Sequence, residues 1–167
     1  RRSAAEPGED LLQMLLDARD PETGEGMTDA QLRDEVVTLF AAGHETTAQA
    51  LTWVFYLLDQ HPDEDALLHR EVTQMLGDRR PGFDDLHPLQ RTRMIFDETL
   101  RLYPPAFSIS RFAEKADRLG GEGGDGLLVP RGAYVTVSPY ITHRNPKLWP
   151  DPEIFNPDRF ADEKVHA

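Results

Sequence analysis

The chain of 167 residues contains no cysteine. This absence excludes disulfides, thiolate zinc sites and a cysteine nucleophile within this stretch. Basic residues are also scarce, because 18 lysines and arginines are set against 30 aspartates and glutamates, for a formal charge of −12. A nucleic-acid surface needs the opposite sign of charge, so we expect a soluble protein with no nucleic-acid partner.

The first residues lack the features of a targeting segment. No initiator methionine precedes Arg1 and Arg2, and no apolar run follows them. We therefore expect neither a signal peptide nor a membrane anchor in this stretch, and a cytoplasmic protein. Because both ends look cut, we interpret residues 1–167 as part of a single domain that is incomplete at both ends.

The longest regular pattern covers residues 27–60 and predicts one helix. Thr28 and Gln31 have the spacing of a capping box, and Pro62 closes the run. From residue 36 to residue 58 almost every face is apolar, which predicts a helix enclosed by protein or by lipid. The polar centre around Glu45 would lie near the middle of a bilayer, so we favour enclosure by protein.

The middle of this helix combines small residues with an acid and hydroxyls, in the order Ala41-Ala42-Gly43-His44-Glu45-Thr46-Thr47. One interpretation is structural, because small residues allow close packing and mid-helix threonines bond preceding carbonyls and bend a helix. The other is that a ligand approaches the backbone at this gap. A zinc hydrolase motif is excluded, because Ala48 occupies the position of its second histidine.

Shorter patterns predict the remaining elements. We expect a short helix from Asp10 to about Asp20, a helix from Asp63 to Gly77, and a third helix from Pro88 to Tyr103. We treat His61 and His69 as surface residues.

Beyond the third helix the helical period disappears. We expect short strands within residues 106–113, 127–129 and 133–137 and a helical turn at 138–142, with a flexible glycine-rich loop at 120–126. Residues 145–160 contain four prolines and three aromatic residues, which predicts an ordered coil rather than a helix or strand. The fold class predicted is mainly α with a small β region (α+β), built on the long helix.

The third helix also carries a candidate site. Glu98 and Arg101 are three residues apart and therefore share one helical face. On an exposed face such a pair contributes only a few tenths of a kcal/mol. Apolar neighbours and the break at Pro104 favour a functional role instead.

Three separated segments resemble motifs of the cytochrome P-450 family of haem-thiolate monooxygenases. Residues 42–47 resemble its oxygen-activating segment on a long central helix, and residues 98–101 resemble its Glu-x-x-Arg motif. Residues 157–160 resemble its Pro-Glu-Arg-Phe motif, with Asp158 in place of glutamate. The Tyr103-Pro104-Pro105 segment, the Arg111 strand and residues 143–152 fall in family order, so the resemblance covers nearly the whole chain.

The resemblance implies a haem-dependent enzyme that inserts one oxygen atom of O2 into a small, largely apolar substrate. Its cofactor would be haem b. Electrons from NAD(P)H would arrive through a redox partner, either a ferredoxin or a flavoprotein reductase. The alternative from another class is a non-enzymatic helical module that binds a partner protein through its apolar helix faces.

The resemblance also implies roles for individual residues. Glu45 and Thr46 would be catalytic and relay protons, which requires an acid and a hydroxyl in a dry site. The cofactor-binding residues would be Ala42, Gly43 and Thr46, with Arg111 pairing with a haem propionate. Glu98, Arg101 and Arg159 would form a buried triad that holds residues 145–160. The substrate-lining positions would be Phe40, Ala41, Phe107, Ser108 and Ile109.

One departure concerns the iron. The family holds it with a cysteine thiolate from a loop that follows residues of the 145–160 type, and no cysteine is present here. We treat His166 as a tail residue and expect no metal ligand within residues 1–167. We therefore interpret the chain as an internal fragment, inactive alone, of such an enzyme.

Overall fold

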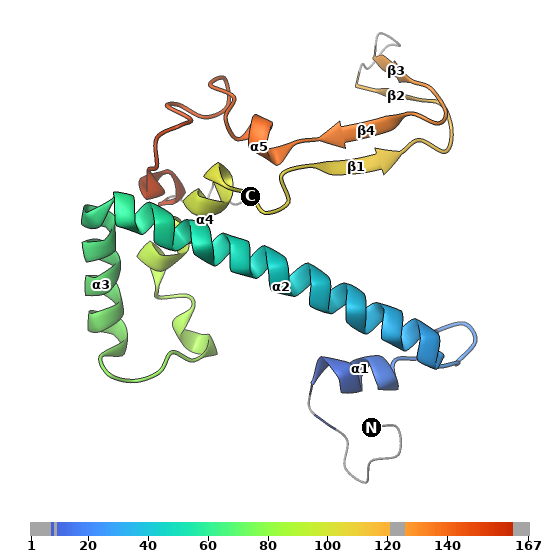
Figure 1. The fold of residues 1–167 in the computed structure, drawn as a ribbon, viewed down its shortest axis with the longest axis horizontal. Coiled ribbons are helices and arrows are strands. Elements are labelled where there is room, and N and C mark those ends of the chain that lie inside the picture. Colours follow the sequence, from blue (N-terminus) through green and yellow to red (C-terminus); the bar gives the residue numbers. More distant parts are fainter. Residues whose placement is uncertain (1–7, 9, 121–125, 162–167) are drawn as a thin grey trace. The chain divides into compact units, whose positions relative to one another are not determined.

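The computed structural model describes residue 8, residues 10–120 and residues 126–161. The described chain divides within its longest helix into two compact units, residues 1–47 and 48–167. The elements are α1 (Leu11–Asp17), α2 (Asp29–Gln60), α3 (Pro62–Leu76), the 3₁₀ turn η1 (Phe83–Asp85), α4 (Gln90–Leu102), β1 (Ile109–Phe112), β2 (Asp117–Leu119), β3 (Leu127–Val129), β4 (Tyr134–Val137), α5 (Pro139–Thr142) and the 3₁₀ turn η2 (Pro157–Phe160) (Figure 1).

In the first unit, local hydrogen bonds define where the helices begin. The Asp10 side chain accepts from the Gln13 amide at 3.1 Å and starts α1. The predicted capping box of α2 is confirmed, because the Thr28 amide donates to Gln31 Oε1 at 2.9 Å and the Gln31 amide donates to Thr28 Oγ1 at 3.3 Å. Both helix starts were therefore predictable from local sequence.

The predicted enclosure of α2 by protein is wrong for most of its length in this structure. Phe40 is 68% exposed and Phe55 is 70% exposed, and the buried residues of α2 are Ala50, Leu57 and Leu58. An apolar face shows what a helix can bury, whereas its exposure depends on whether other segments pack on it. None of the helices in the described part of the chain combines the length and hydropathy that a membrane crossing needs.

The second unit has a core where the carboxyl end of α2 meets α4 and the coil of residues 143–160. Its buried members are Leu57, Leu58, Ile95, Leu102 and Phe155. An aromatic cluster extends it, since the Trp53 and Tyr103 rings stack with centroids 4.0 Å apart. His61, expected at the surface, is half-buried because its ring lies 4.9 Å from that of Phe155.

Helix α3 follows α2 after one residue, His61, and Pro62 occupies its first turn, where a missing N–H costs nothing. The chain then turns into η1, and Arg79, which precedes that turn, donates to both carboxylate oxygens of Asp85 at 2.5 and 2.6 Å. The hydrogen bond from Arg79, followed by one from the Gly82 amide, lowers the pKa of Asp85 to about 2.

The start of α4 is capped by a residue from another helix. Its N-cap, Leu89, has no side chain that can accept a hydrogen bond. Glu71 of α3 accepts instead from the Arg91 amide at 2.6 Å and from the Thr92 amide at 2.9 Å. These are the second and third amides of α4, which a capping side chain normally satisfies.

The β region consists of two antiparallel pairs, β1 with β4 and β2 with β3 (Figure 1). Three strands match the predicted segments, and Arg111 of β1 pairs in register with Val135 of β4. Strand β2 was missed, because Asp117-Arg118-Leu119 has little intrinsic strand preference and is defined by its pairing with Leu127–Val129. Residues 121–125 of the predicted glycine-rich loop lie outside the described residues.

The predicted coil of residues 145–160 is correct except at its end. Pro157 starts a 3₁₀ turn, and Asn156 caps it by accepting from the Asp158 amide at 3.1 Å. Proline excludes a long helix but suits the first position of a single turn. The predicted helical turn at 138–142 is confirmed as α5, with Ser138 as its cap.

The core of the second unit should depend on Ile95, which is 1% exposed. We expect Ile95→Ala to lower the free energy of unfolding by about 2–4 kcal/mol, because truncation leaves a cavity among packed side chains. Leu148→Ala is the control, since Leu148 is 60% exposed. Urea denaturation of both variants checks this, and equal losses would contradict the assigned core.

Candidate functional site

Glu98 and Arg101 form a buried ion pair on α4. Glu98 is 0% exposed and Arg101 is 2% exposed. The contact is bidentate, with Arg101 Nε 2.6 Å from Glu98 Oε2 and Arg101 Nη2 2.9 Å from Glu98 Oε1. Parallel charge-assisted bonds of this kind fix the orientation of both groups.

The rest of the Arg101 guanidinium binds the coil that follows α5. Nη1 donates to the carbonyl oxygens of His143 and Pro152 at 2.8 and 2.7 Å, and Nη2 donates to that of Ile154 at 3.2 Å. Together with the two bonds to Glu98, these contacts use all five N–H groups of the guanidinium. The charge of Arg101 is therefore satisfied by one carboxylate and three backbone carbonyls.

Glu98 binds the same coil at a second place. Its Oε1 accepts from the Asn156 amide at 2.8 Å and from Arg159 Nε at 3.4 Å. Arg159 also donates through Nη2 to the Asp151 carbonyl at 2.7 Å. The structure thus brings Glu98, Arg101 and Arg159 together in one cluster, which we call the Glu98 cluster.

Two neighbouring residues complete the Glu98 cluster. His143 Nδ1 lies 3.1 Å from the Arg101 carbonyl oxygen, and the His143 carbonyl oxygen accepts from Arg101 Nη1. The two residues are therefore joined by two hydrogen bonds, each between the side chain of one and the backbone of the other. Asp151 has a positive φ of 46°, a conformation that aspartate tolerates better than most residues. This places its carbonyl where Ile154 and Arg159 both donate to it.

The central segment of α2 is exposed, and its Thr46 hydroxyl makes a local hydrogen bond. Thr46 Oγ1 donates to the Ala42 carbonyl oxygen at 2.6 Å, which is the back-bonded geometry of the structural interpretation. A Cβ added to Gly43 would meet nothing within 4 Å. His44 stacks on Phe40, with ring centroids 5.3 Å apart. Ala41, Glu45 and Thr46 are exposed among the described residues.

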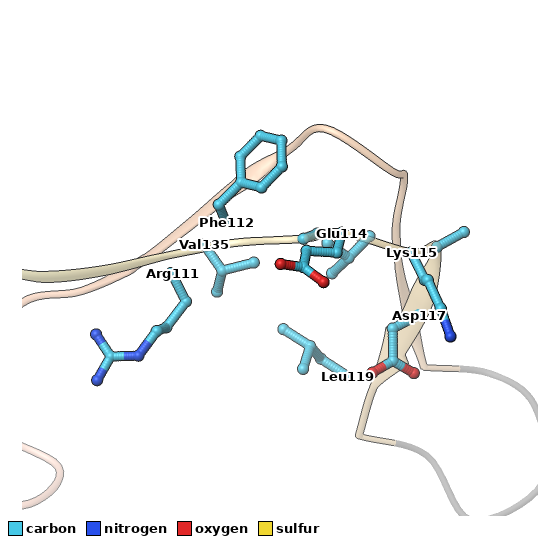
Figure 2. A pocket seen from close by; sticks show the side chains of 10 residues that line it. Arg111, Phe112, Glu114, Lys115, Asp117, Leu119 and Val135 are labelled. Carbon is cyan, nitrogen blue, oxygen red and sulfur yellow. The ribbon is translucent and has the colours of Figure 1, made fainter. Parts of the chain in front are cut away.

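Arg111 lies on β1 beside a pocket between the two strand pairs. Figure 2 shows its guanidinium directed away from the Glu114 and Asp117 carboxylates that line the same pocket. Its Nη1 donates to the Ser110 carbonyl at 3.0 Å. No carboxylate among the described residues pairs with Arg111, which leaves its charge available to an anion.

The predicted substrate-lining residues at the start of β1 are exposed. Phe107 is 64% exposed and Ile109 is 46% exposed, and Ser108 lies between them. Phe107 lines a second pocket with the aromatic side chains of Trp53, Tyr103 and Tyr140. The structure gives this pocket an apolar wall within the second unit.

Sequence reasoning missed several residues of this region. The carboxylates of Glu64 and Glu71 on α3 contact α4. The guanidinium of Arg91 on α4 contacts Asp158 in η2. Glu64 and Glu71 are seven residues apart and lie on the same face of α3, a spacing that could have marked them as facing a neighbour. Nothing in the local sequence identifies the partner of Arg91.

Removal of the Glu98 charge should destabilise the protein strongly. We expect Glu98→Gln to lower the free energy of unfolding by about 3–5 kcal/mol, because two arginines lose their buried carboxylate. Asp97→Asn is the control, since its ion pair with Arg93 spans 3.7 Å and Arg93 is half-exposed; it should cost less than about 1 kcal/mol. Similar losses in the two variants, measured by urea denaturation, would count against the Glu98 cluster.

Comparison with known proteins identifies a family for this chain. The family model described as Cytochrome P450 matches residues 1–167. The chain is 43% identical over 165 residues to cyclooctat-9-en-7-ol 5-monooxygenase of Streptomyces melanosporofaciens, covering 99% of this chain and 35% of that protein. It is 43% identical over 153 residues to cytochrome P450 4A10 of Mus musculus, covering 91% of this chain and 29% of that protein.

A plant relative shows the same pattern: cytochrome P450 97B2, chloroplastic, of Glycine max is 44% identical over 153 residues, which cover 90% of this chain and 26% of that protein. The chain spans about a third of the length of the curated relatives it matches. Nothing in these findings supports the non-enzymatic interaction module. Because the family model extends over every residue, the chain belongs to the cytochrome P450 family.

Proposed function

We propose that this chain forms part of a haem-dependent monooxygenase that inserts one oxygen atom of O2 into a small apolar substrate. The observation that carries the proposal is the family match over residues 1–167, within which the motif residues Glu98, Arg101 and Arg159 lie in contact. Haem, when bound in the complete protein, supplies the iron at which O2 is reduced. Its electrons derive from NAD(P)H through a redox partner, a ferredoxin or a flavoprotein reductase.

Two features of the described residues fit a haem. Arg111 is exposed and has no carboxylate partner among the described residues, so it can donate to a propionate. Gly43 leaves open space on its side of α2, where Ala42 adds little bulk. The iron ligand does not come from these residues, because a thiolate requires a cysteine and the sequence has none.

In this proposal the Glu98 cluster has a structural role. It anchors the coil of residues 143–160 to α4 through buried, charge-assisted bonds. A coil without regular structure keeps its shape only when its backbone groups find such partners. The Glu98 cluster would therefore fix the segment that leads to the iron-binding part of the complete protein.

Glu45 and Thr46 would hold and move protons. The Thr46 hydroxyl donates its proton to the Ala42 carbonyl, so its oxygen is free to accept a hydrogen bond from a water or other donor. Glu45, the adjacent carboxylate, would take up and release protons beside the Thr46 hydroxyl. The substrate would contact Phe40 and Ala41 on α2 and residues 107–109. One relative is named as a monooxygenase of cyclooctat-9-en-7-ol.

The spectrum of the reduced carbon monoxide complex tests the haem proposal. We expect the complete protein to show the shifted Soret band of thiolate-ligated haem, because the thiolate donates electron density to the iron. The measurement is a difference spectrum of the dithionite-reduced protein with and without carbon monoxide. A complete protein that binds haem without this shift would contradict the proposal.

The role of Thr46 can be separated from its contribution to the helix. We expect Thr46→Ala to raise NAD(P)H consumed per product formed, because proton delivery becomes less controlled. Thr52→Ala is a matched control, since Thr52 Oγ1 donates to the Ala48 carbonyl at 2.8 Å in the same geometry and is also exposed. Unchanged coupling in Thr46→Ala, or equal uncoupling in both variants, would rule out the proton-relay role.

A further inference from the structure

Arg91 joins three segments that are far apart in the sequence. Its Nε donates to Glu64 Oε2 on α3 at 2.8 Å, and its Nη2 donates to the same oxygen. Its Nη1 donates to Asp158 Oδ1 in η2 at 2.5 Å. One guanidinium therefore connects α3, the first turn of α4 and η2, and none of the motifs above includes it.

The surroundings of Arg91 make its bonds with Glu64 stronger than an ordinary surface pair, whereas Asp158 is 69% exposed. The side chains of Arg91 and Glu64 are 16% and 14% exposed. Desolvation alone would lower the pKa of Arg91, but the hydrogen bonds with Glu64 and Asp158 outweigh it and raise the pKa above its usual value. By contrast, Arg93 is 51% exposed and its nitrogen lies 3.7 Å from Asp97. Screening by water is weaker at Arg91 than at Arg93.

Asp158 and Arg159 are consecutive residues with different partners on α4. Asp158 pairs with Arg91 at the start of the helix, and Arg159 pairs with Glu98 two turns further along. Two turns correspond to about 11 Å along the helix axis. The 3₁₀ turn η2 is thus held to α4 at two separate points.

The second of these points is the weaker one. Arg159 Nε lies 3.4 Å from Glu98 Oε1, whereas Arg101 contacts the same carboxylate at 2.6 and 2.9 Å. A contact of 3.4 Å has little freedom to lengthen before it ceases to be a hydrogen bond. The position of η2 along α4 therefore decides whether Arg159 reaches Glu98.

The start of α4 is itself held in place from α3. Glu71 accepts from two amides of its first turn and from the Thr92 hydroxyl at 2.8 Å. Glu64 on the same face of α3 binds the Arg91 side chain. Arg91 is consequently fixed by its backbone and its side chain before it contacts Asp158.

We propose that Arg91 is a positioning residue, whose ion pair with Asp158 holds η2 at the place where Arg159 reaches Glu98. Helix α3 holds Arg91 in place for this contact, because Glu71 binds the backbone at the start of α4 and Glu64 binds the Arg91 side chain. The proposal concerns residues 64–159 alone and does not depend on the haem chemistry proposed above.

Amide hydrogen exchange in the complete protein tests this role. The reporters are the Asn156 amide, which donates to Glu98, and the Arg159 amide, which donates to the Asn156 carbonyl. We expect Asp158→Asn to speed exchange at both amides about tenfold or more, because η2 opens locally without its ion pair. Amides of α2 near Leu57 should exchange at the wild-type rate.

Glu153→Gln provides a matched control. Glu153 lies in the same coil, its side chain is 69% exposed like that of Asp158, and it pairs with Arg144, which is 13% exposed. This variant should leave exchange at Asn156 and Arg159 unchanged. Asp158→Glu should restore slow exchange, since it keeps the carboxylate, and Arg91→Lys should behave like Asp158→Asn, since an ammonium lacks the fork that serves two carboxylates.

Three results would overturn the proposal. One is equal exchange rates in Asp158→Asn and the wild type. Another is equal acceleration in Asp158→Asn and Glu153→Gln, which would show that any lost surface pair has this effect. The third is acceleration that extends equally to α2, which would show a general loss of stability instead of a local loss of position. The exchange rates require no turnover, so they are independent of the carbon monoxide spectrum.

Discussion

A buried carboxylate needs positive charge and hydrogen-bond donors beside it, because without them its burial costs several kcal/mol of folding free energy. Glu98 meets this requirement with four donors: two groups of Arg101, the Asn156 amide and Arg159. All four donors come from residues on the same helix or on the coil that it anchors. The second unit is arranged so that this carboxylate is never left unpaired, and the order of residues 143–160 depends on it.

The same requirement explains why an irregular coil can be ordered. Residues 143–160 lack the ladder of backbone bonds that holds a strand or helix, so their carbonyls need other donors. Arg101 supplies three of them, at His143, Pro152 and Ile154. A lysine could not replace it, because its three N–H groups do not form the planar fork that serves one carboxylate and several carbonyls together. Replacement of either member of the pair would therefore affect the coil as well as α4.

The sequence predicted where helices and strands form better than it predicted which segments pack against them. The capping box of α2, the end of α3 near Gly77 and the three strands with β-branched residues are local signals, so one segment at a time was sufficient. Strand β2 and the cap that Glu71 provides for α4 were missed because each is defined by a partner elsewhere in the chain. The apolar face of α2 was recognised, but its exposure could not be predicted from the face alone.

The candidate site divides in the same way. Glu98 and Arg101 could be paired from their spacing, whereas the carbonyls that Arg101 binds could not, because backbone acceptors carry no sequence signal. Arg91 has no motif around it and was found only through its contacts. Family resemblance identified Glu45, Thr46 and Arg111, and their proposed roles rest on that resemblance. The structure shows a back-bonded Thr46 hydroxyl and an Arg111 guanidinium without a carboxylate partner among the described residues.

Glu98 and Arg101 act as one buried unit, and a double-mutant cycle measures how strongly they are coupled. Glu98→Gln, Arg101→Met and the double variant would be compared by urea denaturation of the complete protein. We expect a coupling energy on the order of 3 kcal/mol, because each single change leaves its former partner charged and buried. Losses that simply add, with a coupling energy near zero, would contradict it.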